Sequence, residues 1–239
     1  MKRPCRLCLR DAILRRSHIV PEFAYRPVFG SSHTAVLWQP KKLKRSYRQT
    51  GYWDRLLCDA CENRLSGLER YFADVWFYRP LRPDRLQGPT VRISGLDYTK
   101  FKLFHLSILW RAGVTALKVF SSVSLGRRAD DMRQRILAND PGPPDVYPIT
   151  GLALRNADGS FREDLMLLPL GARVSGHHVY EMLFGGVFWL YDVSGHRKGC
   201  PIPSGLESEG RLTLFVQDWT QNLAIRDLAK TMQKHLHAG

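Results

Sequence analysis

The sequence lacks an apolar run of roughly 18 residues, the length that a membrane-spanning helix requires. Its most apolar stretch, residues 182–193, is interrupted by Gly185-Gly186. Nothing at its N-terminus resembles a signal peptide. It has no phosphate-cradling glycine loop and no Gly-x-Ser-x-Gly elbow, which argues against an NTPase or a serine hydrolase. With an ordinary hydrophobic content of 44%, the chain is expected to be a folded protein that does not enter a membrane.

Cysteine is scarce, and four of the five cysteines form two pairs of identical spacing, Cys5-Arg-Leu-Cys8 and Cys58-Asp-Ala-Cys61. A Cys-x-x-Cys turn directs two thiolates at one point in space. Two such turns complete a tetrahedral shell that suits Zn²⁺, an ion without a geometric preference of its own. The spacing therefore predicts one structural zinc ion held by Cys5, Cys8, Cys58 and Cys61.

Two other interpretations of the cysteine pairs are weaker. A thioredoxin-like dithiol would follow a buried strand, and no such strand precedes Cys5. A disulfide framework is typical of short secreted chains. Thiols that hold a metal must stay reduced, so the expected location is the cytoplasm. The fifth cysteine, Cys200, is expected to be a free thiol without a special role.

Acidic residues are also few: 22 Asp and Glu stand against 36 Lys and Arg, for a net charge of +14. Residues 1–60 carry +9 of this charge. Such an asymmetry is typical of a protein that binds a polyanion, above all nucleic acid, with DNA favoured over RNA. The alternative is a basic, soluble surface without a partner. The residues expected to contact nucleic acid are Arg15, Arg16, Lys41, Lys42, Lys44, Arg45 and Arg48.

The spacing of apolar residues predicts helices over residues 62–79, 101–112, 128–138 and 221–237. Strands are expected over residues 146–154, 165–170, 178–184, 187–193 and 211–216, with turns of the antiparallel kind at 156–159 and at Gly185-Gly186. This pattern indicates an α+β fold, in which a zinc module with four cysteine ligands (residues 1–95) precedes a domain of helices and antiparallel sheet (residues 96–239).

The run Ser17-His18-Ile19-Val20-Pro21 lies between the two cysteine pairs. With those pairs, it resembles the HNH, or ββα-metal, nuclease family on its treble-clef scaffold, over residues 1–75. Zinc-bearing members of that family carry an Asp-His-Ile-x-Pro-like run between two Cys-x-x-Cys pairs, the second of which opens the final helix. The resemblance implies that His18 activates a water as general base, while one Mg²⁺ or Mn²⁺ ion stabilises the leaving oxygen of a phosphodiester.

The chain departs from the family pattern at three positions. Ser17 replaces an aspartate that would hold the catalytic ion, and it is a poorer ligand for a hard cation. Glu62 replaces the histidine or asparagine after the second cysteine pair, and glutamate binds Mg²⁺ or Mn²⁺ well. The middle asparagine is missing, and Asp54 is the nearest polar replacement. The resemblance therefore implies His18, Glu62 and Asp54 as catalytic residues. The alternative is that His18 packs within a purely structural zinc fold.

The leading hypothesis is a zinc-containing, nucleic-acid-binding protein of the HNH-like kind that hydrolyses phosphodiester bonds. The second is a non-catalytic, zinc-stabilised module that binds nucleic acid or protein. In it, residues 96–239 would recognise a protein partner or support self-association. The third is a zinc-stabilised structural protein whose charge is incidental. The missing aspartate and asparagine favour the second hypothesis, and the His-Ile-Val-Pro run with Glu62 favours the first.

Overall fold

A computed structural model describes residues 2–29, 35–37, 46–48, 51–174, 176–194 and 204–221. Several sequence-based expectations fall outside this part of the chain. They concern the C-terminal helix beyond residue 221, the free thiol of Cys200, and the basic residues Lys41, Lys42, Lys44 and Arg45. Arg48 is described by its backbone alone.

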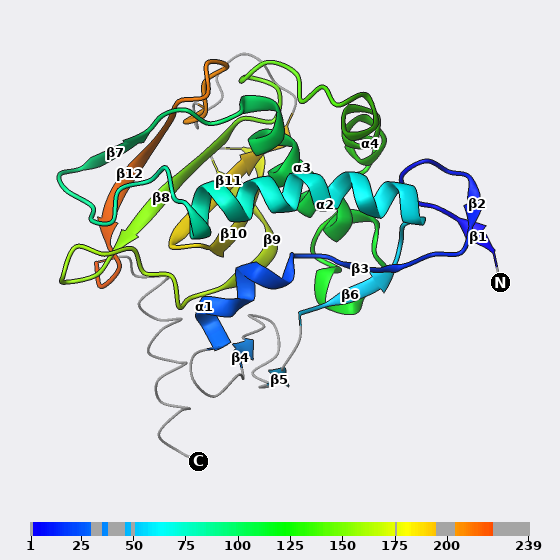
Figure 1. Ribbon diagram of the computed structural model, residues 1–239, viewed down its shortest axis with the longest axis horizontal. Coiled ribbons are helices and arrows are strands. Elements are labelled where there is room, and N and C mark those ends of the chain that lie inside the picture. The colour runs from blue at the N-terminus through cyan, green and yellow to red at the C-terminus, as the bar shows by residue number, and fades with distance from the viewer. Residues whose placement is uncertain are drawn as a thin grey trace.

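Figure 1 shows the arrangement of the helices and strands. The helical elements are η1 (Glu22–Tyr25), α1 (Arg26–Phe29), α2 (Asp59–Ala73), the π-helical turn η2 (Asp74–Tyr78), α3 (Tyr98–Val114), η3 (Lys118–Phe120) and α4 (Arg128–Ala138). The strands are β1 (Arg3–Pro4), β2 (Asp11–Ala12), β3 (Arg16–His18), β4 (Ala35–Leu37), β5 (Ser46–Arg48), β6 (Trp53–Arg55), β7 (Thr90–Ile93), β8 (Ile149–Arg155), β9 (Leu167–Val174), β10 (His177–Phe184), β11 (Val187–Asp192) and β12 (Leu212–Asp218).

The α+β class is confirmed by a six-stranded sheet of order β7-β12-β8-β11-β10-β9 with helices packed beside it (Figure 1). The sheet was expected to be antiparallel, and all of its pairs are so except one, because β12 runs parallel to β8. The amide of Asp192 at the end of β11 donates to the carbonyl of Pro148 just before β8. The C-terminal end of β11 therefore lies beside the N-terminal end of β8. β12 begins at the same end of the sheet and so runs in the same direction as β8.

The predicted hairpin at Gly185-Gly186 is confirmed, since it joins the antiparallel strands β10 and β11. Both glycines have positive φ, 60° and 75°, as a two-residue turn of this kind requires. The indole N–H of Trp76 donates to the carbonyl of Gly185 at 2.9 Å. This turn thus also docks the sheet on the helical layer.

The three predicted helices in the described part of the chain are confirmed. The first begins at Asp59, inside the second cysteine pair, and continues through η2 to Tyr78. The second, α3, has Asp97 as its N-cap, whose carboxylate accepts from the amide of Lys100. None of the described helices has both the length and the apolar character needed to cross a bilayer.

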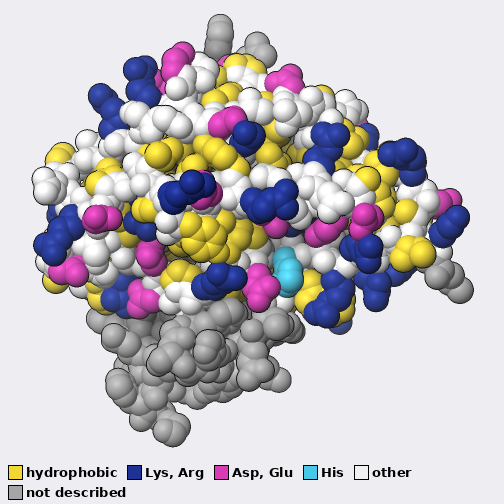
Figure 2. Space-filling model, in the orientation of Figure 1, with side chains coloured by type: hydrophobic (Ala, Val, Ile, Leu, Met, Phe, Trp, Pro, Cys, Tyr) yellow, Lys and Arg dark blue, Asp and Glu magenta, His cyan; other side chains and the backbone are white. Residues whose placement is uncertain are grey.

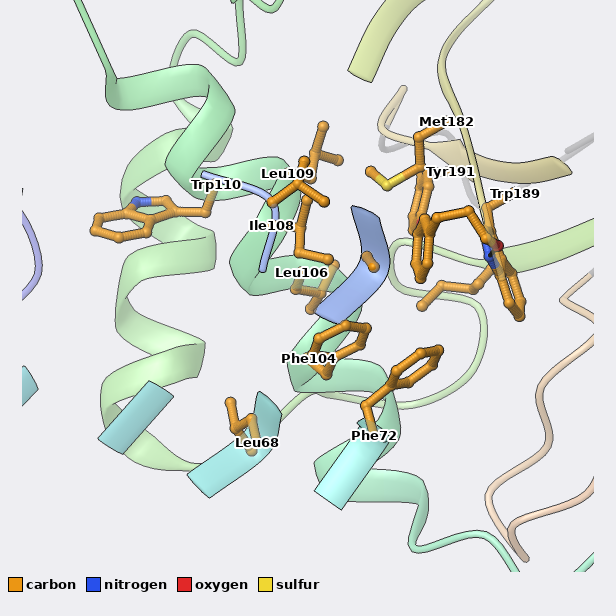
Figure 3. Close-up of a cluster of buried hydrophobic side chains, with 14 of the residues drawn as sticks. Leu68, Phe72, Phe104, Leu106, Ile108, Leu109, Trp110, Met182, Trp189 and Tyr191 are labelled. Atoms are coloured by element: carbon orange, nitrogen blue, oxygen red, sulfur yellow. Dashed lines mark hydrogen bonds between the residues drawn. The ribbon is translucent and has the colours of Figure 1, made fainter. Parts of the chain in front are cut away.

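The core lies between α2, α3 and the sheet, as Figure 3 shows for Phe72, Phe104, Trp189 and their neighbours. The rings of Phe72 and Phe104 stack with centroids 4.0 Å apart and join the two helices. α3 is buried at every residue from Phe101 to Ala112, and α2 and α4 both pack against it. A single hydrophobic cluster includes residues from Cys5 to Leu214, so residues before and after position 95 share a core. The domain boundary at that position stays a prediction.

Candidate metal centre and histidine site

The four paired cysteines meet at one point, as their spacing predicts. Cys5 and Cys8 lie in the turn between β1 and β2, while Cys58 and Cys61 lie at the start of α2. The four sulfur atoms are all within 4.8 Å of one another. This is a shell that could hold a metal ion such as zinc, with four ligand atoms of one kind.

Backbone hydrogen bonds hold the first turn in place. The amide of Cys5 donates to the carbonyl of Arg10, and the amide of Leu9 donates to that of Cys5, both at 2.9 Å. Leu9 has a φ of 63°, the left-handed conformation that closes such a turn. The amide of Cys58 donates to the Cys5 sulfur at 3.3 Å, which links the two halves of the shell.

The surroundings of the thiols act on their acidity in opposite directions. Burial raises the pKa of Cys61 and of Cys58. Burial also acts to raise the pKa of Cys8, but hydrogen bonds from the backbone and side chain of Arg10 outweigh it and lower that pKa to about 6. Arg10 thus supplies positive charge beside thiolates, which a four-thiolate metal shell needs.

β3 and β6 form a two-stranded antiparallel ribbon beside α2, which we call the ribbon. Its register pairs Arg16 with Arg55, Ser17 with Asp54, and His18 with Trp53. Because neighbours along a strand point to opposite faces, Ser17 and Asp54 occupy the inner face. Ser17 is fully buried, whereas both arginines are exposed. His18 therefore shares the outer face with Arg16, Trp53 and Arg55.

Glu62 faces the inner side of the ribbon. The hydroxyl of Ser17 donates to Oε2 of Glu62 at 2.6 Å. Burial raises the pKa of Glu62, against the opposing effects of this hydrogen bond and of the Arg111 charge. The two positions that the family resemblance implies as ligands of a catalytic ion are thus side by side, but a hydrogen bond joins them.

Asp54 accepts hydrogen bonds from residues just past the end of α3. Its Oδ2 accepts from the Thr115 hydroxyl at 2.7 Å, and its Oδ1 accepts from the Arg55 amide at 2.7 Å. Burial raises the pKa of Asp54, yet these and further hydrogen bonds lower it overall. Among the described residues, the four cysteines are the only cluster of potential metal ligands. His18, Glu62 and Asp54 therefore do not form a cluster of three potential ligands in the described part of the chain.

His18 is half-buried and lines an open hollow of about 800 Å³, together with Glu22, Glu69 and Arg70. Burial lowers the pKa of His18, although Glu22 and Glu69 act in the opposite direction. The ring has no hydrogen-bond partner in the part of the chain that the structure describes, and its backbone oxygen accepts from Arg111 at 2.6 Å. Burial thus favours the neutral form of the imidazole, which lines the hollow.

The two predicted nucleic-acid contacts with described side chains differ in their surroundings. Arg15 forms an ion pair with Asp59 at 2.8 Å. The guanidinium of Arg16 lies 4.0 Å from the centroid of the Trp53 ring. Arg6 and Arg55, which lie close in sequence to Cys5 and Cys58, are two further exposed arginines of this part of the chain.

Comparison of the chain with known protein families, with characterised proteins and with solved structures finds no match.

Proposed function

We propose that this protein contains a structural zinc ion, binds nucleic acid, and hydrolyses a phosphodiester bond with His18 as general base. One observation carries the proposal: the half-buried imidazole lines an open hollow, and it shares the outer face of the ribbon with Arg16 and Arg55. A proton acceptor is thereby placed beside two groups that pair with phosphate oxygens.

The chemistry needs an imidazole that is unprotonated before the reaction. The lowered pKa of His18 supplies it at cellular pH. In the proposed step, a water oxygen bonds to phosphorus while its proton passes to the His18 ring. The bond from phosphorus to the leaving oxygen breaks, and that oxygen takes a proton from solvent. The guanidinium of Arg16 or Arg55 stabilises the charge that develops on the phosphate oxygens.

Zinc has a structural role in this proposal. Its four thiolates would join the β1–β2 turn to the first turn of α2. Arg6 lies in the β1–β2 turn, and its amide donates to the carbonyl of Leu56, which follows β6. A metal at the cysteines would thus fix the ribbon that carries His18.

The test is a nicking assay on supercoiled plasmid and on short duplexes, with wild type and His18→Ala. His178→Ala is the matched control, because His178 is a half-buried histidine on β10, in the sheet. We expect His18→Ala to lose cleavage by about 10²–10⁴-fold, as for other general bases, with zinc content and nucleic-acid affinity unchanged. Equal cleavage by wild type and His18→Ala would refute the proposal.

The second candidate is a non-catalytic module that binds nucleic acid. A specific observation favours it: Glu62 and Asp54 are engaged by Ser17 and Thr115, so the carboxylates expected to serve catalysis have structural partners. Absence of cleavage by wild type, with and without added Mg²⁺ or Mn²⁺, together with intact binding would establish this candidate.

A further inference from the structure

The hollow that His18 lines also contains an exposed aromatic ring. Tyr78 is 58% exposed, and it lines this hollow together with His18, Pro21 and Phe23. Between α2 and α1, the face drawn in Figure 2 shows a hydrophobic patch with charged side chains of both signs around it. The volume of the hollow, about 800 Å³, is that of sites which bind small organic groups. A planar ring is what an exposed tyrosine in such a hollow fits.

A π-helical turn positions Tyr78. The turn is η2, and the amide of Arg79 donates to the carbonyl of Asp74, five residues earlier, at 2.7 Å. Such turns are rare and frequently lie at functional sites. Within it, Trp76 is buried and bonds the carbonyl of Gly185 in the sheet, whereas Tyr78 is exposed. The turn is thus anchored in the core while its last residue lines the hollow.

The Tyr78 side chain is held from two sides and its ring is uncovered. Nη1 of Arg26 donates to the Tyr78 hydroxyl at 2.9 Å. The guanidinium of Arg79 donates to both carboxylate oxygens of Asp74, at 2.8 and 2.9 Å, which closes the turn. Among the described residues, no aromatic ring and no cation stacks on Tyr78. A ring that is already positioned loses less conformational entropy when it binds a ligand.

The charges of the hollow suit a phosphate beside this ring. Ion pairs with arginines neutralise two of the acids that line it, Glu69 and Asp74. The third acid is Glu22, and it is accompanied by Arg26 and Arg70. Arg70 is exposed and takes part in no ion pair of the described chain. The hollow therefore combines an uncovered aromatic ring with a guanidinium that is available to a phosphate oxygen.

We propose that Tyr78 stacks on an unpaired base of the bound nucleic acid, while Arg70 contacts the phosphates next to that base and the adjacent phosphodiester lies at His18. The inference rests on the proposed function, since it names the part of the nucleic acid that the same hollow takes. A base inside a duplex is already stacked between its neighbours, so only an unpaired or extruded base reaches such a ring. Stacking tolerates any base, because every base has a π face.

Binding is tested by fluorescence anisotropy in the full-length His18→Ala background without divalent ions, so that cleavage cannot interfere. The probe is a duplex of about 20 base pairs, longer than one turn of the helix, with one unpaired nucleotide in its middle. A second probe has an abasic sugar at that position, which keeps the phosphates and removes the base. Loss of the base should weaken binding by about 5- to 150-fold, the effect of one stacked base.

Variants show whether Tyr78 is the group that stacks on the base. Tyr78→Ala should lose the same factor with the first probe and nothing further with the abasic one, because both changes remove one contact. Tyr78→Phe keeps the ring and should keep most of the preference for the base. Leu81→Ala is the matched control, because Leu81 is 44% exposed in the same segment but does not line the hollow. It should discriminate between the probes as the parent protein does.

Three results would overturn this inference: equal affinity of the parent protein for the two probes, undiminished discrimination in Tyr78→Ala, or an equal loss in Leu81→Ala. Zinc content and circular dichroism confirm that each variant is folded. Discrimination that depends on Tyr78, without cleavage by wild type, would uphold the stacking site and refute hydrolysis. Cleavage that depends on His18, with binding indifferent to the base, would do the reverse.

Discussion

Nη1 of Arg111 donates a hydrogen bond to the backbone oxygen of His18 at 2.6 Å. The same nitrogen bonds Oε1 of Glu69 at 2.7 Å, and the Arg111 side chain is fully buried. Arg111 comes from α3, His18 from β3 and Glu69 from α2. One buried guanidinium thus ties the ribbon to both long helices and fixes the backbone of the proposed base.

Replacing Arg111 with Met should destabilise the protein by about 3–5 kcal/mol, because it leaves the partly buried Glu69 carboxylate and the His18 carbonyl without their donor. The measurement is urea unfolding. The double variant Arg111→Met/Glu69→Gln should recover part of the loss, since no unpaired charge remains. Arg79→Met is the control, because Arg79 forms an exposed ion pair with Asp74. A variant Arg111→Met as stable as Arg79→Met would contradict this prediction.

Zinc should bind with one ion per chain and contribute directly to folding. Elemental analysis of protein purified without chelator tests the stoichiometry. Cys58→Ser should lose the ion and lower the midpoint of thermal unfolding, whereas Cys200→Ser should change neither. Full zinc content in Cys58→Ser would show that the shell of four sulfurs does not hold the metal.

His105 should make stability depend on pH. It is fully buried among aromatic rings, and burial lowers its pKa to about 3. The unfolded residue has a pKa of about 6.5, so below that value the unfolded chain takes up a proton that the folded chain does not. The stability is fully present above about pH 6.5 and is lost as the pH falls towards 3.

The variant His105→Gln keeps a polar group for the Tyr191 hydroxyl, which lies 2.7 Å from His105 Nδ1, and removes the titration. Free energies of unfolding at about pH 7 and about pH 5, on either side of the unfolded pKa, should differ less in this variant than in wild type. The comparison between variants separates His105 from the metal thiolates, whose protonation affects both proteins alike. Identical pH dependence in the two proteins would refute the assignment to His105.

The pH dependence of cleavage should report His18. A general base acts unprotonated, and burial lowers its pKa below the ordinary value of about 6.5. The rate should therefore rise with pH through a point below that value and stay level above it. A rate that falls over that range would assign the essential group a different role.

The elements that could be predicted from the sequence are those set by local pattern. The sequence predicts helix α4 at the bounds observed, because its apolar spacing ends just before Asn139 and prolines follow. Asn139 adopts the left-handed conformation at the end of this helix. The cysteine shell follows from spacing alone. Strand β7 was missed, since a strand from Thr90 to Ile93 is too short to stand out.

The details of the histidine site could not be predicted, because they depend on contacts between distant residues. β3 and β6 have three residues each and lie far apart in sequence, so neither gives a pattern that reveals their register. The partners of Glu62 and Asp54 come from β3 and from the end of α3. The bond from Arg111 to His18 spans 93 positions. Only the fold brings these groups together.

The most direct measurement is single-turnover cleavage of a short duplex by wild type and His18→Ala, at matched zinc content and with the enzyme in excess. Hydrolysis with His18 as general base predicts a rate at least about 10²-fold lower in the variant, with the duplex bound equally well by both proteins. Equal rates in the two proteins, or no cleavage by wild type with and without Mg²⁺ or Mn²⁺, would contradict it.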